Sequence, residues 1–82
     1  MKQAFWEKTY YSEYSKLVKD NPKYYAQIML LAKEELKCCI ERLTDRLWCE
    51  VNRDTTPLVI GKANAISNLM NSNKRYFAKE AR

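Results

Sequence analysis

The chain has 82 residues, of which 46% are hydrophobic and 12% aromatic, so it is long and apolar enough for one small folded domain and is not a disordered segment. Its net charge of +5 favours acidic partners or surfaces. Three cysteines, two of them adjacent, exclude a disulfide framework, and with no histidine they exclude a structural zinc site. We expect a reducing, cytoplasmic setting and no metal or cofactor.

The positive charge lies toward the two ends of the chain. Residues 1–23 carry a net charge of +2, residues 24–56 a net charge of −1, and residues 57–82 a net charge of +4. The first twenty residues contain no apolar signal-peptide core. The longest apolar run, Ile28 to Ala32, is far shorter than the roughly 20 residues that cross a bilayer. We therefore expect a soluble protein without a membrane role.

Residues 3–19 are predicted to form the first helix, because apolar side chains recur there at helical spacing. They are Phe5, Trp6, Tyr10, Tyr14, Leu17 and Val18. Trp and Tyr combine a large apolar area with a polar tip, so they suit both core edges and interfaces. This leaves two interpretations, a core face or a recognition surface built from Trp6, Tyr10, Tyr11 and Tyr14.

A second helix is predicted over residues 22–52, after the Asp20-Asn21-Pro22 signal for a helix end and a new start. From residue 25 to residue 51 there is no Gly or Pro. Apolar residues recur in steps of three and four: Tyr25, Met29, Ala32, Leu36, Ile40, Leu43, Leu47 and Val51. We expect Cys39 in the core, with Cys38 and Cys49 at its margins. At about 45 Å, this helix is longer than either neighbour, so part of its stripe should remain uncovered.

The opposite side of this helix carries charges of both signs, as on a solvated face. Its carboxylates have no histidine, no nucleophile with a base and no phosphate-binding loop beside them in the sequence. We therefore predict that the protein is not an enzyme.

The third helix is predicted over residues 57–71, with Thr56 and Pro57 as its start signal. Gly61, the only glycine, should cost up to about 1 kcal/mol there relative to Ala. We expect it to let this helix lie close to the long one. Residues 74–82 follow as a basic tail or short helix. The predicted fold is all-α: one domain, residues 1–82, in which three helices pack antiparallel and the long second helix is the central one.

Three features together resemble the small helical proteins of tailed bacteriophages: the aromatic FWEKTYYSEYSKL start, the long helix and the GKANAISNLM segment. Gly61, Lys62, Ile66 and Leu69 carry the match in the last segment. Ala63, where a larger apolar residue is usual, and the basic tail depart from it. The resemblance implies a phage or prophage product that binds or assembles with proteins. It implies no catalytic residue.

Two functions follow as hypotheses. The first is a protein-interaction role, with a homodimer and a host factor or virion component as partners, and with inhibition of host defence among the outcomes. Aromatic anchors dominate interface energetics, so the expected interface residues are Trp6, Tyr10, Tyr11 and Trp48. The alternative is nucleic-acid binding, in which the phosphate-contacting and stacking residues are Lys62, Lys74, Arg75, Tyr76, Lys79 and Arg82. Asn64, Asn68 and Asn71 are then the candidates for reading bases.

Overall fold

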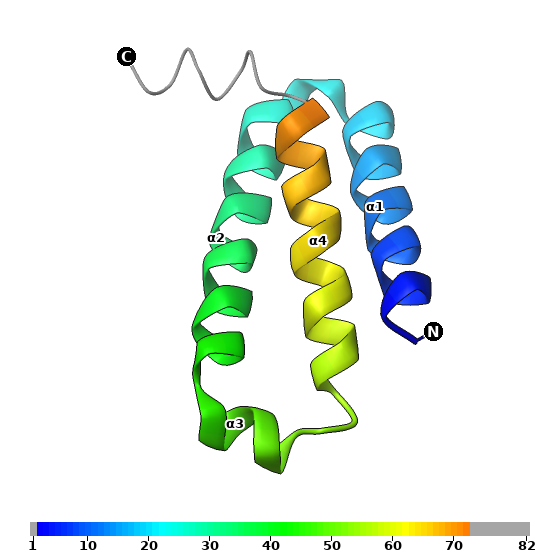
Figure 1. The fold of residues 1–82 in the computed structure, drawn as a ribbon. Helices are drawn as coiled ribbons and strands as arrows, with labels where there is room; N and C mark the ends of the chain where they lie inside the picture. Colours follow the sequence, from blue (N-terminus) through cyan, green and yellow to red (C-terminus); the bar gives the residue numbers. More distant parts are fainter. Residues whose placement is uncertain (1, 73–82) are drawn as a thin grey trace.

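A computed structural model describes residues 2–72 and confirms the all-α prediction for them. The helices are α1 (Lys2–Asp20), α2 (Tyr25–Thr44), α3 (Arg46–Val51) and α4 (Thr56–Ser72), with a single 3₁₀ turn, η1 (Pro22–Tyr24), between α1 and α2. The predicted basic tail at residues 74–82 lies outside the described residues. Figure 1 shows α1, α2 and α4 side by side, with α3 across the end where α2 finishes.

The central helix is α4, which corrects the prediction that the long second helix holds the centre. α4 packs against both α1 and α2, while α1 and α2 contact each other much less. Its buried residues are Val59, Gly61, Ala63, Ala65, Ile66 and Leu69. Three of these residues, Gly61, Ala63 and Ala65, have small side chains or none, so both α1 and α2 can lie close to α4. α1 and α4 run in the same direction and α2 runs opposite to both (Figure 1).

Two clusters of buried side chains form the core. The first cluster contains Tyr14 of α1, Met29 and Ala32 of α2, and Ile66 and Leu69 of α4. Cys39, Val59 and Ala63 form the second, nearer to α3. Leu36 packs against both clusters and joins them. The prediction that Cys39 is a core residue is therefore confirmed.

The predicted helix over residues 22–52 is interrupted at Asp45. That residue has an extended backbone, with φ −89° and ψ 104°, and its Oδ1 accepts a hydrogen bond from the Trp48 N–H at 3.1 Å. Thr44 Oγ1 donates to the Ile40 carbonyl at 3.0 Å, and Cys49 Sγ donates to the Arg42 carbonyl at 3.5 Å. Side chains thus satisfy carbonyls at the end of α2 and an N–H at the start of α3, which removes the need for a continuous helix.

The apolar stripe of the second helix is covered in its first half, and in its second half Leu43 still packs against the second core cluster while other stripe residues are exposed. Met29 and Ala32 are fully buried, whereas Ile40 is 51% exposed, Leu47 69% and Val51 75%. The prediction that part of the stripe remains uncovered is confirmed. The break at Asp45 contributes, because Leu47 and Val51 belong to α3 and do not continue the buried face of α2.

Candidate interaction surfaces

The four predicted interface residues do not form one surface. Trp6 and Tyr10 lie together on α1, with ring centroids 5.9 Å apart. Tyr11 points to a different side of α1, where its hydroxyl lies 3.2 Å from Ser72 Oγ. Trp48 packs against the second core cluster from α3, with Arg42 over its ring at 5.8 Å. All four are half-buried, so each already contributes to packing within the chain.

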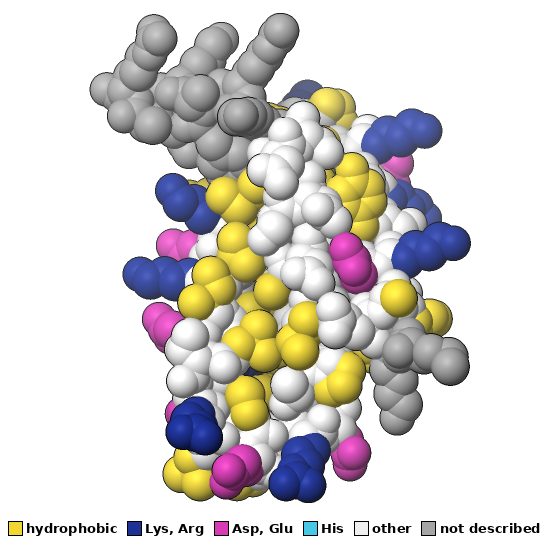
Figure 2. All heavy atoms as spheres, viewed as in Figure 1, with side chains coloured by type: hydrophobic (Ala, Val, Ile, Leu, Met, Phe, Trp, Pro, Cys, Tyr) yellow, Lys and Arg dark blue, Asp and Glu magenta, His cyan; other side chains and the backbone are white. Residues whose placement is uncertain are grey.

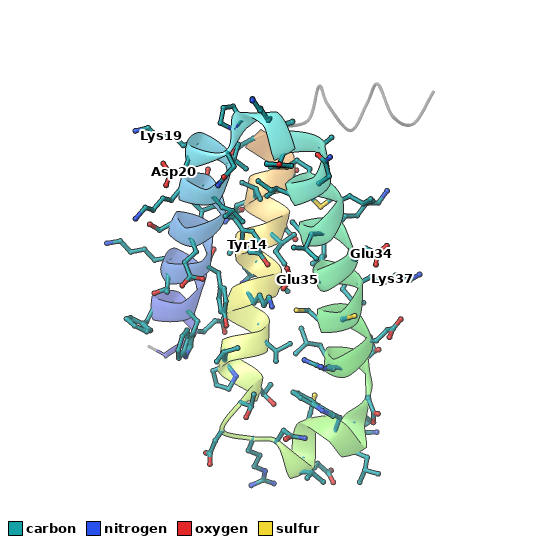
Figure 3. The ribbon with its side chains drawn as sticks, turned by 180° about the vertical axis from the view of Figure 1, so that it is seen from behind. Tyr14, Lys19, Asp20, Glu34, Glu35 and Lys37 are labelled. Carbon is teal, nitrogen blue, oxygen red and sulfur yellow. The ribbon has the colours of Figure 1, made fainter. Side chains whose placement is uncertain are left out.

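A partly buried ion pair links α2 to α4. Lys62 Nζ lies 2.6 Å from Glu35 Oε2, and both side chains are less than a third exposed. Lys62 also lies over the ring of Tyr10, 5.3 Å from its centroid. Figure 3 shows Tyr14 of α1 and Glu35 of α2 approaching each other across α4, while Glu34 points outward. One charged pair therefore connects all three long helices.

Partial burial shifts the pKa values of the side chains around this ion pair. Burial, together with a hydrogen bond to the Glu35 carboxylate, raises the pKa of Tyr14. Burial opposes the charge of Lys62, but the hydrogen bond and charge of Glu35 outweigh it, so the Lys62 pKa is raised. Burial raises the pKa of the Cys39 thiol as well. At neutral pH the arrangement is a charged pair with protonated neighbours, which is suited to holding helices together.

We expect Glu35→Gln to lower the free energy of unfolding by about 1–2 kcal/mol, between the values typical of exposed and buried ion pairs. The substitution keeps the shape of the side chain but leaves the Lys62 charge without its partner in a partly desolvated site. Urea unfolding at neutral pH measures the change. Glu34→Gln, at the neighbouring exposed position, is the matched control and should change stability by less than about 0.5 kcal/mol. Equal effects at the two positions would show that the pair has no structural role.

An open groove follows the contact between α1 and α4. Its lining includes Tyr11 and Ser15 of α1, and Asn68, Asn71 and Ser72 of α4. The aliphatic part of its lining includes Ala4, and Lys8, Lys16 and Lys19 stand along its α1 side. Glu7, whose Oε1 accepts a hydrogen bond from Asn68 Nδ2 at 3.1 Å, also borders it, as does Asp20.

Several large apolar side chains are exposed, including some that were expected in the core. Besides Ile40, Leu47 and Val51, they are Phe5, Leu17, Tyr24, Leu30 and Leu31. Leu47 and Val51 are one turn apart on the six-residue α3, which has no fully buried residue. In the sequence, the Thr44-Asp45 pair is the one signal for this exposure. Such a pair is typical of a helix start, so it would have placed Leu47 and Val51 on a separate helix.

The alternative nucleic-acid site receives little support from the described residues. Lys62 already contacts Glu35 and the ring of Tyr10, so its charge is paired within the chain. Lys74, Arg75, Tyr76, Lys79 and Arg82 lie outside the described part of the chain. Within residues 2–72 no three His, Cys, Asp or Glu side chains are grouped to hold a metal ion. None of the helices there has the length and hydrophobicity needed to cross a membrane.

No protein-family model matches this chain, and neither a curated protein nor a solved structure matches it.

Proposed function

We propose that this chain is a non-enzymatic protein-interaction module that pairs with a second copy of itself through α3. The observation that carries the proposal is the exposure of Leu47 at 69% and of Val51 at 75% on one face of that short helix. Ile40, which is 51% exposed near the end of α2, adds apolar area close by in the chain. Covering these side chains contributes roughly 25 cal/mol per Å² of apolar surface removed from water.

The charges on α3 favour a second copy as the occupant. Arg46 and Glu50 are both exposed and lie one turn apart, beside Leu47 and Val51. When two α3 helices pack antiparallel about a two-fold axis, Arg46 of one copy lies near Glu50 of the other. Leu47 of one copy then lies near Val51 of the other. A parallel arrangement would place like charges opposite each other, so the two-fold arrangement is the complementary one.

The distribution of charge along the chain also favours a dimer contact at α3. Two copies with a net charge of +5 each repel one another. Residues 24–56, which include all of α2 and α3, carry a net charge of −1, so contact there brings the least like charge together. Because α3 is short, the contact is small, and we expect a dimer with a dissociation constant on the order of micromolar.

Charge reversal on α3 tests the proposal. Arg46→Glu leaves two acids on each α3 and Glu50→Arg leaves two bases, so each variant alone should dimerise at least about tenfold more weakly than the parent. A mixture of the two variants should recover pairing as a heterodimer, measured by sedimentation velocity or by fluorescence transfer between labelled chains. Unchanged dimerisation of the single variants, or no recovery in the mixture, contradicts the proposal.

The exposed pair Lys37 and Glu41 on α2 provides the matched control. These residues have the same spacing and chemistry as Arg46 and Glu50 but lie on another helix. Lys37→Glu and Glu41→Lys should therefore leave dimerisation within about twofold of the parent.

The resemblance to small helical phage proteins supports a cellular setting for this proposal. In that setting the dimer is the form that meets a host factor or a virion component in the host cytoplasm. The exposed apolar side chains that α3 pairing leaves uncovered, such as Leu30 and Leu31, are then available to that partner.

A further inference from the structure

The bend at Asp45 interrupts a helical pattern that the sequence continues. Asp45 alone separates α2 from α3, and residues 25–51 contain no Gly or Pro. Apolar residues keep their helical spacing through the bend, at Leu36, Ile40, Leu43, Leu47 and Val51. Figure 2 shows hydrophobic side chains along the α2 side of the molecule and again at its lower end, where α3 lies. The sequence therefore also suits one straight helix over residues 25–51, with a length of about 40 Å.

Local side-chain contacts stabilise the bend. The Asp45 carboxylate caps α3 by accepting a hydrogen bond from the Trp48 N–H at 3.1 Å, and a cap of this kind is worth about 1 kcal/mol. Cys49 Sγ donates to the Arg42 carbonyl at 3.5 Å, and Trp48 packs against the second core cluster. α3 itself has no fully buried residue. Straightening therefore exchanges local contacts for the backbone hydrogen bonds of a continuous helix.

A straight helix prevents α4 from packing against α2 of its own chain in the observed register. In the bent form, Val59 of α4 lies in one cluster with Cys39 of α2. Residues 45–51, when in line with α2, carry the chain about 10 Å beyond Thr44. α4 would then have to return over that distance and also cross about 9 Å to its place beside α2. Residues 52–55, which join α3 to α4, span at most about 14 Å when extended, which leaves none to reverse the chain.

We propose that two copies of this chain exchange α4 when residues 25–51 straighten, so that α4 of each copy packs between α1 and α2 of the other. The exchange rebuilds contacts that the single chain already makes, including the first core cluster and the Glu35–Lys62 pair. For this reason the exchange of an identical element is a low-cost route to a dimer. The two straight helices can also lie antiparallel, so that each covers the exposed Leu47 and Val51 of the other. This dimer differs from the pairing of bent chains through α3, because it separates only when α4 leaves its site.

Chemical cross-linking of Glu35 to Lys62 distinguishes exchanged chains from unexchanged ones. These side chains are 2.6 Å apart, so a carbodiimide, which joins a carboxylate to an amine without a spacer, can link them. An equal mixture of ¹⁵N-labelled and unlabelled full chain is unfolded in urea, refolded at high protein concentration and cross-linked. Exchange gives linked peptides with one heavy and one light member, which mass spectrometry counts. Pairing through α3 leaves every Glu35–Lys62 link within one chain, so the two kinds of dimer are told apart.

Two substitutions of Asp45 test the role of the bend. Asp45→Leu removes the cap and favours the straight helix, whereas Asp45→Asn keeps a side-chain oxygen that caps α3. Mixed links should be at least about tenfold more abundant in Asp45→Leu than in Asp45→Asn, since each dimer contains two bends that must straighten. In the parent, mixed links should increase with the protein concentration during refolding. The inference is overturned if mixed links are equally abundant in the two variants, or if the parent gives none at any refolding concentration.

Discussion

Replacing Gly61 with Ala is expected to lower the free energy of unfolding by about 2 kcal/mol or more, although Ala is the better helix former by about 1 kcal/mol. A Cβ at this position would lie 2.7 Å from the Gln3 carbonyl oxygen, 2.8 Å from the Glu7 backbone nitrogen and 2.8 Å from Trp6 Cβ. Two of these atoms belong to the backbone of α1, and the third is fixed to it. No side-chain rotation relieves the overlap, so α1 must move away from α4.

The measurement is thermal unfolding followed by circular dichroism, in which Gly61→Ala should lower the midpoint by about 10 °C or more. Ser67→Ala is the control, because it makes the same small side chain at an exposed position of α4. That variant should change stability by no more than about 0.5 kcal/mol. A Gly61→Ala protein as stable as the parent would show that α1 does not approach α4 as closely as described.

Replacing Ile66 with Ala is expected to cost about 2–5 kcal/mol, which is the range for truncating a buried aliphatic side chain. Ile66 has no exposed surface and packs in the cluster that contains Tyr14 of α1 and Met29 of α2. It therefore joins all three long helices, and the cavity left behind borders each of them. For a domain of this size the total stability is roughly 4–12 kcal/mol, so the loss is a large share of it.

Ile60→Ala is the matched control for this substitution, because it removes the same atoms from the same helix at a half-exposed position. We expect it to cost less than about 1 kcal/mol, since little apolar surface is lost from the core and Ala favours the helix. Urea unfolding of both variants gives the comparison. Similar losses at the two positions would contradict the central placement of α4.

The first and last helices were predictable from sequence because their signals are local. The spacing of aromatic residues predicted residues 3–19, and the helix is Lys2–Asp20. Thr56 and Pro57 marked the start of the last helix, which is Thr56–Ser72. Burial of Cys39 also followed from periodicity.

The centre of the fold and the break in the second helix were not predictable in the same way. The length of the second helix favoured it as the centre of the fold. The central helix must instead have small residues where two neighbours pack against it. In α4 these are Gly61, Ala63 and Ala65. Gly61 proved to face α1 and not the long helix, because spacing cannot say which neighbour approaches. The break at Asp45 depends on side-chain hydrogen bonds from Thr44 and Cys49, which do not disturb the apolar period.

The interface residues were also not predictable, because the spacing of apolar residues does not show which of them pack within the chain. Aromatic residues were the natural interface candidates, yet Trp48 packs against the second core cluster and Trp6 lies beside the close α1–α4 contact. The exposed aliphatic residues Leu47 and Val51 continued a core-like stripe in the sequence. Only the turn of the chain at Asp45 separates them from the covered part of that stripe.

The most direct test of the account is the mass of the full chain in solution, measured by sedimentation equilibrium over a wide concentration range. The account predicts a mass that rises from 9.8 kDa toward twice that value as concentration increases. It also predicts that Leu47→Glu holds the mass at that of one chain, while Leu31→Glu, at a similarly exposed leucine of α2, does not. A parent protein that remains at 9.8 kDa up to millimolar concentration would contradict the proposed pairing.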